Sequence, residues 1–201
     1  MGQRSQMYIR VNRPDGKYHL VARYFGWNYG ERMVSRARHT LEWVKKNTEK
    51  LLFFFEQEFF IKLAKIMEVN FDMHDVVISA DILGEVRKGD YGPDSIFTGQ
   101  DNNDGQFILD VHLDYENKSQ EDASITFKYA FLDCGSKNPM NAEAYMQWDN
   151  GDPEQPWREN QYIKNALEYT EQNIAYIDQN AALMTEEEAN EFVTCDYTES
   201  I

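Results

Sequence analysis

Two stretches in which apolar residues recur at every second position constrain the fold of this chain more than any other feature. The first runs from Phe107 to Tyr115 and the second from Ile125 to Phe131. Alternation with a period of two places apolar side chains on one face of a β-strand and polar side chains on the other. The polar loop 116–122 connects the two stretches, so we predict that they pair as strands. The turn residues Asn103-Asp104-Gly105 lead into this pair.

The N-terminal region has a second pattern of this kind. Residues 7–11 alternate, and alternation returns over residues 18–25. Between them, Arg13-Pro14-Asp15-Gly16 supplies turn chemistry, because proline fixes φ and glycine tolerates positive φ. Residues 6–25 are therefore predicted to form a β-hairpin.

Helical periodicity replaces alternation after Gly30. Apolar residues from Met33 to Val44 recur at spacings of four, four and three, which predicts one face of a helix. A second helix is predicted over Thr48–Val69, where the apolar surface is unusually broad. So broad a surface indicates core packing, and a homodimer contact through the Phe53–Phe60 surface is the alternative.

The remaining elements follow from weaker signals. We predict, in chain order, a strand over 76–82, a loop region over 84–105, a short helix beginning at Asn141, and a helix over Gln161–Asn180. Thr185-x-x-Glu188 forms a capping box, in which each side chain satisfies a free backbone N–H of the first helical turn. The box predicts a last short helix.

These elements predict a single α+β domain over residues 1–201: an N-terminal β-hairpin, two consecutive helices, a mainly antiparallel sheet and C-terminal helices. The chain has 201 residues, of which 42% are hydrophobic, enough for a sizeable core. No apolar run approaches the roughly 18 residues of a membrane span. Two cysteines make neither a disulfide framework nor a metal site, so we expect a cytoplasmic protein without membrane contact.

Charge is distributed unevenly along the chain. Residues 1–69, here called the basic head, hold 13 Lys/Arg and 7 Asp/Glu, a balance of +6. Residues 70–201, the acidic body, hold 7 Lys/Arg and 28 Asp/Glu, a balance of −21. Such asymmetry bears on partners rather than on fold.

The basic head carries arginines interleaved with aromatic residues. Guanidinium groups neutralise phosphates, and aromatic faces stack on bases. The candidates for partner binding are Arg10, Arg23, Trp27, Arg32 and Arg36. Two alternatives stay open: these arginines pair with the acidic body of the same protein, or they contact an acidic protein.

The acidic body has two groups of candidate partner-binding residues. Asp110, Asp114 and Glu116 share one face of a predicted strand, and Asp149, Asp152 and Glu154 lie in a loop-rich segment. With His112, the first group resembles a row of metal ligands. Side chains about 6.6 Å apart along one strand cannot all reach one ion without help from other segments. A solvated sheet face is the favoured interpretation.

An enzyme remains an alternative. Acidic ligands for Mg²⁺ beside a lysine suit phosphodiester hydrolysis, and the residues with this chemistry are Asp94, Asp110, Asp114, Glu116 and Lys118. No phosphate-binding glycine loop, zinc protease motif or nucleophile elbow accompanies them. We therefore favour a non-enzymatic protein with no catalytic residue, no metal and no cofactor.

The opening Met1-Gly2-Gln3-Arg4-Ser5-Gln6, with the later Trp27-Asn28-Tyr29-Gly30-Glu31-Arg32-Met33, resembles a group of small phage and mobile-element proteins. Some members of that group are anti-CRISPR proteins. The resemblance covers roughly the first 45 residues and implies a mobile-element origin.

The resemblance also implies an inhibitor of a host nucleic-acid-handling complex, for which the acidic body would act as a nucleic-acid mimic. The partner would be a protein with a basic nucleic-acid-binding surface, such as a ribonucleoprotein. The alternatives are the nuclease and a homo-oligomeric assembly protein.

Overall fold

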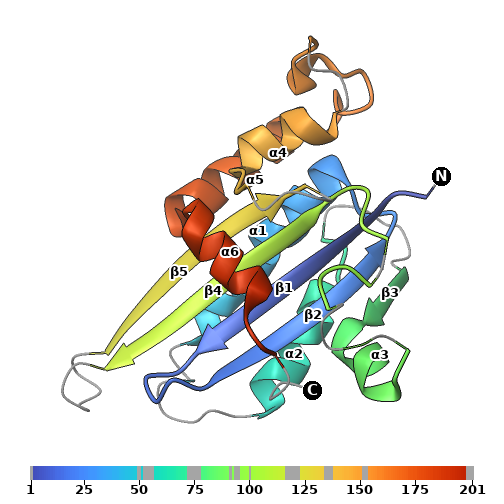
Figure 1. The fold of residues 1–201 in the computed structure, drawn as a ribbon. Coiled ribbons are helices and arrows are strands. Elements are labelled where there is room, and N and C mark those ends of the chain that lie inside the picture. Colours follow the sequence, from blue (N-terminus) through green and yellow to red (C-terminus); the bar gives the residue numbers. More distant parts are fainter. Residues whose placement is uncertain are drawn as a thin grey trace.

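The computed structural model describes residues 2–48, 51, 57–71, 78–90, 92, 96–99, 101–115, 123–133, 138–150 and 154–197. In this part of the chain, six strands form one sheet in the order β3-β2-β1-β4-β5-β6 (Figure 1). The strands are β1 Arg4–Asn12, β2 Tyr18–Gly26, β3 Ile78–Asp81, β4 Gln106–Tyr115, β5 Ala123–Leu132 and β6 Ala182–Leu183. The α+β class is confirmed.

Both predicted strand pairs are present. β1 and β2 pair antiparallel from Arg4↔Gly26 to Asn12↔Tyr18, and Gly16 has a φ of 80° in the turn between them. β4 and β5 pair antiparallel from Gln106↔Leu132 to Tyr115↔Ala123. The alternation of the sequence therefore located both pairs.

The sheet is mixed, because the two pairs meet at a parallel junction. β1 lies beside β4 in parallel, with Gln6 opposite Gln106 and Asn12 opposite His112. β5 and β6 are also parallel, whereas β3 pairs antiparallel with β2. Alternation within one strand carries no information about the direction of its neighbour, so the sequence could not predict this junction.

Helices cover both faces of the sheet. The first face packs against α1 Gly30–Thr48, α2 Gln57–Met67, α4 Ala142–Asp149 and α5 Leu167–Asn180. The opposite face packs against α3 Ile82–Lys88 and α6 Glu186–Thr194. Figure 1 shows α6 crossing in front of the sheet and α1 behind it. Residues on both faces of β1 and β4, such as Ile9 and Tyr8, are therefore fully buried.

The broad apolar surface predicted for the second helix packs into the core over the residues that the structure describes. Phe59, Phe60, Leu63 and Met67 of α2 are buried. Phe60 also packs against His19 of β2, with ring centroids 3.8 Å apart and the rings tilted by 34°. Phe53, which the homodimer alternative included, lies outside the described residues.

Several predicted boundaries differ from the structure. Ile82 begins α3 rather than ending a strand, so a helix occupies the start of the predicted 84–105 loop. Residues 161–166 form turns, and α5 begins only at Leu167. The short helix predicted from Asn141 is present as α4, with the Asn141 side chain as its N-cap, and the Thr185–Glu188 capping box of α6 is confirmed. Across the described ranges, every helix is too short or too polar to cross a bilayer.

Candidate functional site

Arg10 lies beneath α6 and pairs with the acidic body. Its Nε donates to Asp110 Oδ1 at 2.9 Å, and its Nη2 donates to Asp110 Oδ2 at 2.7 Å. The same guanidinium donates to both carboxylate oxygens of Glu191, at 3.0 and 2.7 Å. Arg10 is only 4% exposed, so intramolecular pairing is confirmed for this arginine.

Asp110 is held ionised by this arrangement. Burial acts to raise the pKa of the carboxyl, but hydrogen bonds from Arg10 and His112 outweigh it and lower the pKa to about 2. Asn12 donates a further hydrogen bond to Oδ1 at 2.5 Å. The carboxylate that the sequence placed on a solvated face is thus surrounded by donors inside the protein.

Two other arginines of the basic head, Arg36 and Arg23, also bond to partners within the fold. Arg36 donates to Asn28 Oδ1 at 3.0 Å and to the Met67 carbonyl at 2.6 Å. Burial lowers the pKa of Arg36 to about 10. Arg23 is mostly buried, pairs with Glu68 at 3.3 Å, and lines a cavity of about 430 Å³ between α2, β2 and α3.

Trp27 and Arg32 reach the surface together. Trp27 is 55% exposed and has a φ of 60°, a conformation that a bulky residue rarely adopts. Arg32 Nη1 donates to the Trp27 carbonyl at 3.3 Å, and its guanidinium lies 5.1 Å from the centroid of the Tyr29 ring. Of the five head candidates, this pair retains the aromatic-plus-cation chemistry that contact with nucleic acid requires.

The acidic candidates are spread along β4: Asp110 lies midway, Asp114 lies near the C-terminal end, and Asp149 lies beside Asp104, which precedes the strand. Asp114 is exposed near the C-terminal end of the strand. Asp149 accepts a hydrogen bond from the Gly30 backbone N–H and interacts with Asp104, which precedes the strand. The strand rises about 3.3 Å per residue, so its two ends are separated by roughly 30 Å. Glu154 is exposed, whereas Glu116 and Asp152 lie outside the described residues.

A group of carboxylates surrounds the N-terminal end of α1. Burial and the charge of Asp104 raise the pKa of Asp149 to about 7, and burial raises the pKa of Asp104 to about 6. Burial also raises the pKa of Glu31. Throughout the described ranges, no three His, Cys, Asp or Glu side chains are placed to hold a metal ion.

The nuclease set is not assembled by the described residues. Asp110 is committed to Arg10, and Asp114 lies four residues further along β4, about 13 Å away. Asp94, Glu116 and Lys118 lie outside the described part of the chain. The nuclease therefore stays a prediction without a supporting geometry.

The structure exposes, along the β5 side of the sheet, acidic residues that the sequence patterns did not single out. β6 pairs with β5 at the edge of the sheet, and α5 and α6 come directly before and after it in the chain. Their exposed carboxylates include Asp178, Glu186, Glu187 and Glu191, and Leu183 between them is 44% exposed. We call these five residues the acidic edge.

A sequence signal for the acidic edge was available. After Lys164 the chain contains no further Lys or Arg, while residues 165–201 contain nine Asp/Glu. Two members of the edge have partners within the fold, since Asp178 accepts from the Tyr129 hydroxyl and Glu191 pairs with Arg10. Glu186 and Glu187 lie in the first turn of α6, where the helix dipole favours negative charge.

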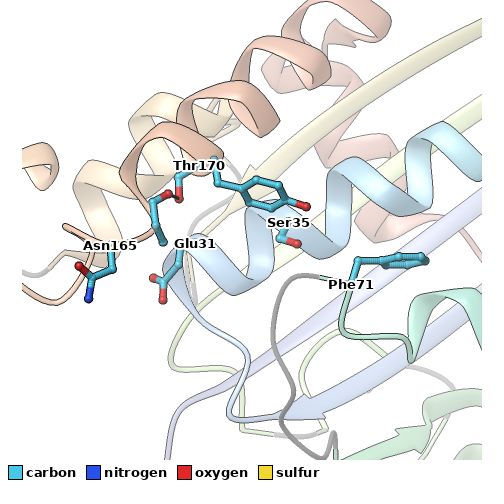
Figure 2. Close-up of a pocket in the computed structure, with 7 residues that line it drawn as sticks. Glu31, Ser35, Phe71, Asn165 and Thr170 are labelled. Carbon is cyan, nitrogen blue, oxygen red and sulfur yellow. Dashed lines mark hydrogen bonds between the residues drawn. The ribbon is translucent and has the colours of Figure 1, made fainter.

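A cavity of about 310 Å³ lies between α1 and the start of α5. Its wall consists of Glu31, Ser35, Phe71, Asn165, Ala166, Tyr169 and Thr170. Figure 2 shows Glu31 and Ser35 on α1, with Asn165 and Thr170 across from them and Phe71 at the far end. The cavity has the size and the mixed lining of a small-molecule site.

Comparisons of this chain with protein-family models, with curated proteins and with solved structures find no match.

Proposed function

We propose that the protein is a non-enzymatic interaction protein that binds a basic partner surface through its acidic edge. The observation that supports this is the exposure of Glu186 and Glu187 on a segment without a single Lys or Arg. Within the described residues, neither carboxylate pairs with a cation. A surface of this kind raises the rate of encounter with a positively charged partner.

The partner is a protein with a nucleic-acid-binding surface. Channels that hold nucleic acid are lined by Lys and Arg that bind the phosphate backbone. Spaced carboxylates on α5 and α6 offer such a channel a substitute for phosphates. Leu183 adds an apolar contact, which a protein partner can bury and a phosphate backbone cannot supply.

The resemblance of the N-terminal region favours one kind of partner. It is an RNA-guided nuclease or a similar host ribonucleoprotein, which the protein inhibits as a nucleic-acid mimic. Asp114, exposed on the sheet face that α6 covers, extends the same surface. Asp149 and Glu154 lie apart from it and are not required by this proposal.

The test measures displacement of nucleic acid. A labelled target DNA is bound to a guide-loaded RNA-guided nuclease, and its release by the protein is followed by fluorescence anisotropy. We expect the wild-type protein to displace the DNA and the double variant Glu186→Lys/Glu187→Lys to lose at least tenfold in potency.

The matched control is Asp15→Lys/Asp90→Lys, which changes the net charge by the same amount at exposed positions of the hairpin turn and the end of α3. It should keep the wild-type potency. Equal losses of potency in both double variants would show that only the net charge matters and would contradict a role for the acidic edge. Failure of the wild-type protein to displace the DNA would contradict the proposal for this partner.

A further inference from the structure

The cavity between α1 and α5 contains a carboxylate without a cationic partner. Glu31 lies on its wall, and burial raises the pKa of this side chain. Among the described residues, no Lys or Arg forms an ion pair with Glu31, and the neighbouring Arg32 acts on it through its charge alone. A largely buried carboxylate is costly unless a positive or hydrogen-bonding group compensates it.

An aromatic wall stands across the cavity from this carboxylate. Phe71 is 47% exposed and Tyr169 is 41% exposed, unusual values for large rings. His39 connects them, because its ring stacks on Phe71 at 4.3 Å and its Nε2 lies 3.3 Å from the Tyr169 hydroxyl. The rings are thus held in place by a third side chain and need not move to receive a ligand.

The remaining lining is polar but uncharged. Ser35 and Thr170 carry hydroxyl groups and Asn165 carries an amide; Figure 2 shows Ser35 on α1 and the other two across from it. Asp149 interacts electrostatically with Glu31 and with Asp104, so further carboxyl groups and no cation lie behind Glu31 among these partners. The cavity therefore repels anions and favours positive charge.

We propose that this cavity binds a small organic cation, with an ammonium or guanidinium group at Glu31 and an apolar body against Phe71 and Tyr169. The cation compensates the Glu31 carboxylate, and aromatic faces within about 6 Å attract positive charge. A metal ion is a poorer fit, because the described residues offer no set of three acidic or imidazole ligands.

This inference does not depend on the proposed function. The cavity is built from α1, Phe71 and the start of α5, whereas the acidic edge centres on β6 and α6. The cationic group could belong to a free amine or to an arginine side chain of a peptide. The two sources share the same chemistry and are separated by the experiment.

The experiment compares three probes of similar shape by isothermal titration calorimetry and NMR: phenethylamine, phenethyl alcohol and 3-phenylpropionate. We expect saturable binding of the amine, at least tenfold weaker binding of the alcohol, and none of the carboxylate. Glu31→Gln should weaken binding of the amine at least tenfold. Phe71→Ala, at a half-exposed position, should weaken it several-fold with the fold intact by circular dichroism.

Glu168→Gln is the matched control, because Glu168 is exposed on α5 outside the cavity wall and its loss changes the net charge equally. It should bind the amine as the wild-type protein does. Agmatine and the tripeptide acetyl-Ala-Arg-Ala-amide form the second arm: tighter agmatine binding assigns the site to free cations, and tighter peptide binding to an arginine side chain. Equal affinity for amine and alcohol, or a Glu31→Gln variant that binds like the wild-type protein, would overturn the inference.

Discussion

Arg10 and Asp110 stand directly opposite each other on the parallel strands β1 and β4, and their side chains form a two-bond ion pair with N–O distances of 2.9 and 2.7 Å. Glu191 of α6 binds the same guanidinium. One arginine therefore connects the N-terminal hairpin, the second strand pair and the helix that covers both. The pair lies where the basic head meets the acidic body. Part of the positive charge of the head is therefore neutralised by carboxylates of the body inside the fold.

Asp110→Ala should lower the free energy of unfolding by about 3 kcal/mol or more, because it leaves the buried guanidinium of Arg10 with the half-exposed Glu191 and a long hydrogen bond to the Tyr197 hydroxyl. Urea unfolding followed by circular dichroism measures the change. Asp114→Ala, on the same strand but exposed, should stay within about 0.5 kcal/mol of the wild-type protein. A loss below about 1 kcal/mol for Asp110→Ala would show that the pair contributes little.

Gly105 should tolerate no side chain. Its φ is 81°, and a Cβ there would lie 2.5 Å from the Leu132 carbonyl oxygen and 3.2 Å from the Trp148 ring. Gly16 has nearly the same φ, 80°, but no atom within 4 Å of its Cβ position. Gly16→Ala should therefore cost about 1 kcal/mol, from backbone strain alone. Gly105→Ala should cost at least about 2 kcal/mol more in the same urea titration, and equal losses would refute the predicted steric contact.

Asp149 should make stability fall as the pH rises. Its pKa is about 7 in the folded protein, well above the usual value for Asp, because of burial and the charges of Asp104 and Glu31. The folded state thus holds the proton more tightly than the unfolded state between about pH 4 and pH 7, and deprotonation across that window costs stability. Tyr145 and the Gly30 N–H are the other groups that act on this carboxyl.

Asp149→Asn should remove this dependence. The variant should gain on the order of 1–3 kcal/mol over the wild-type protein between pH 5 and pH 8, in urea titrations at each pH. Glu154→Gln, an exposed acid nearby in the sequence, should give no such trend. Parallel pH curves for the wild-type protein and Asp149→Asn would show that the pKa of Asp149 is ordinary.

The sequence located the strands but not their surroundings. Alternation at residues 106–115 predicted one buried and one solvated face, yet α6 covers the predicted solvated face over Ile108 and Asp110. Local patterns cannot indicate that a helix about 80 residues later returns to this face. The partner of Asp110 was hidden for the same reason, because the parallel register that places Arg10 opposite it joins residues 100 positions apart.

Helix starts were predicted less well than helix existence. Ile163 fits the periodicity of the predicted 161–180 helix and is buried, but it lies in turns. The Asn160 side chain accepts a hydrogen bond from the Tyr162 N–H, and this local bond competes with helix initiation. By contrast, the capping box of α6 was predictable, since its two residues satisfy each other without help from distant segments.

Binding to naked nucleic acid tests most directly whether the acidic edge, rather than the basic head, is the functional surface. Fluorescence anisotropy of labelled single- and double-stranded DNA and RNA would be measured from about 50 to 200 mM salt, a range over which phosphate contacts weaken strongly. The account predicts no measurable binding at any salt concentration, because the net charge of −15 repels phosphates and Arg10 and Arg36 are enclosed in the fold. Tight binding that weakens with salt, and whose log–log slope falls by about one unit in Arg32→Ala, would contradict it and assign the function to the surface of Trp27 and Arg32.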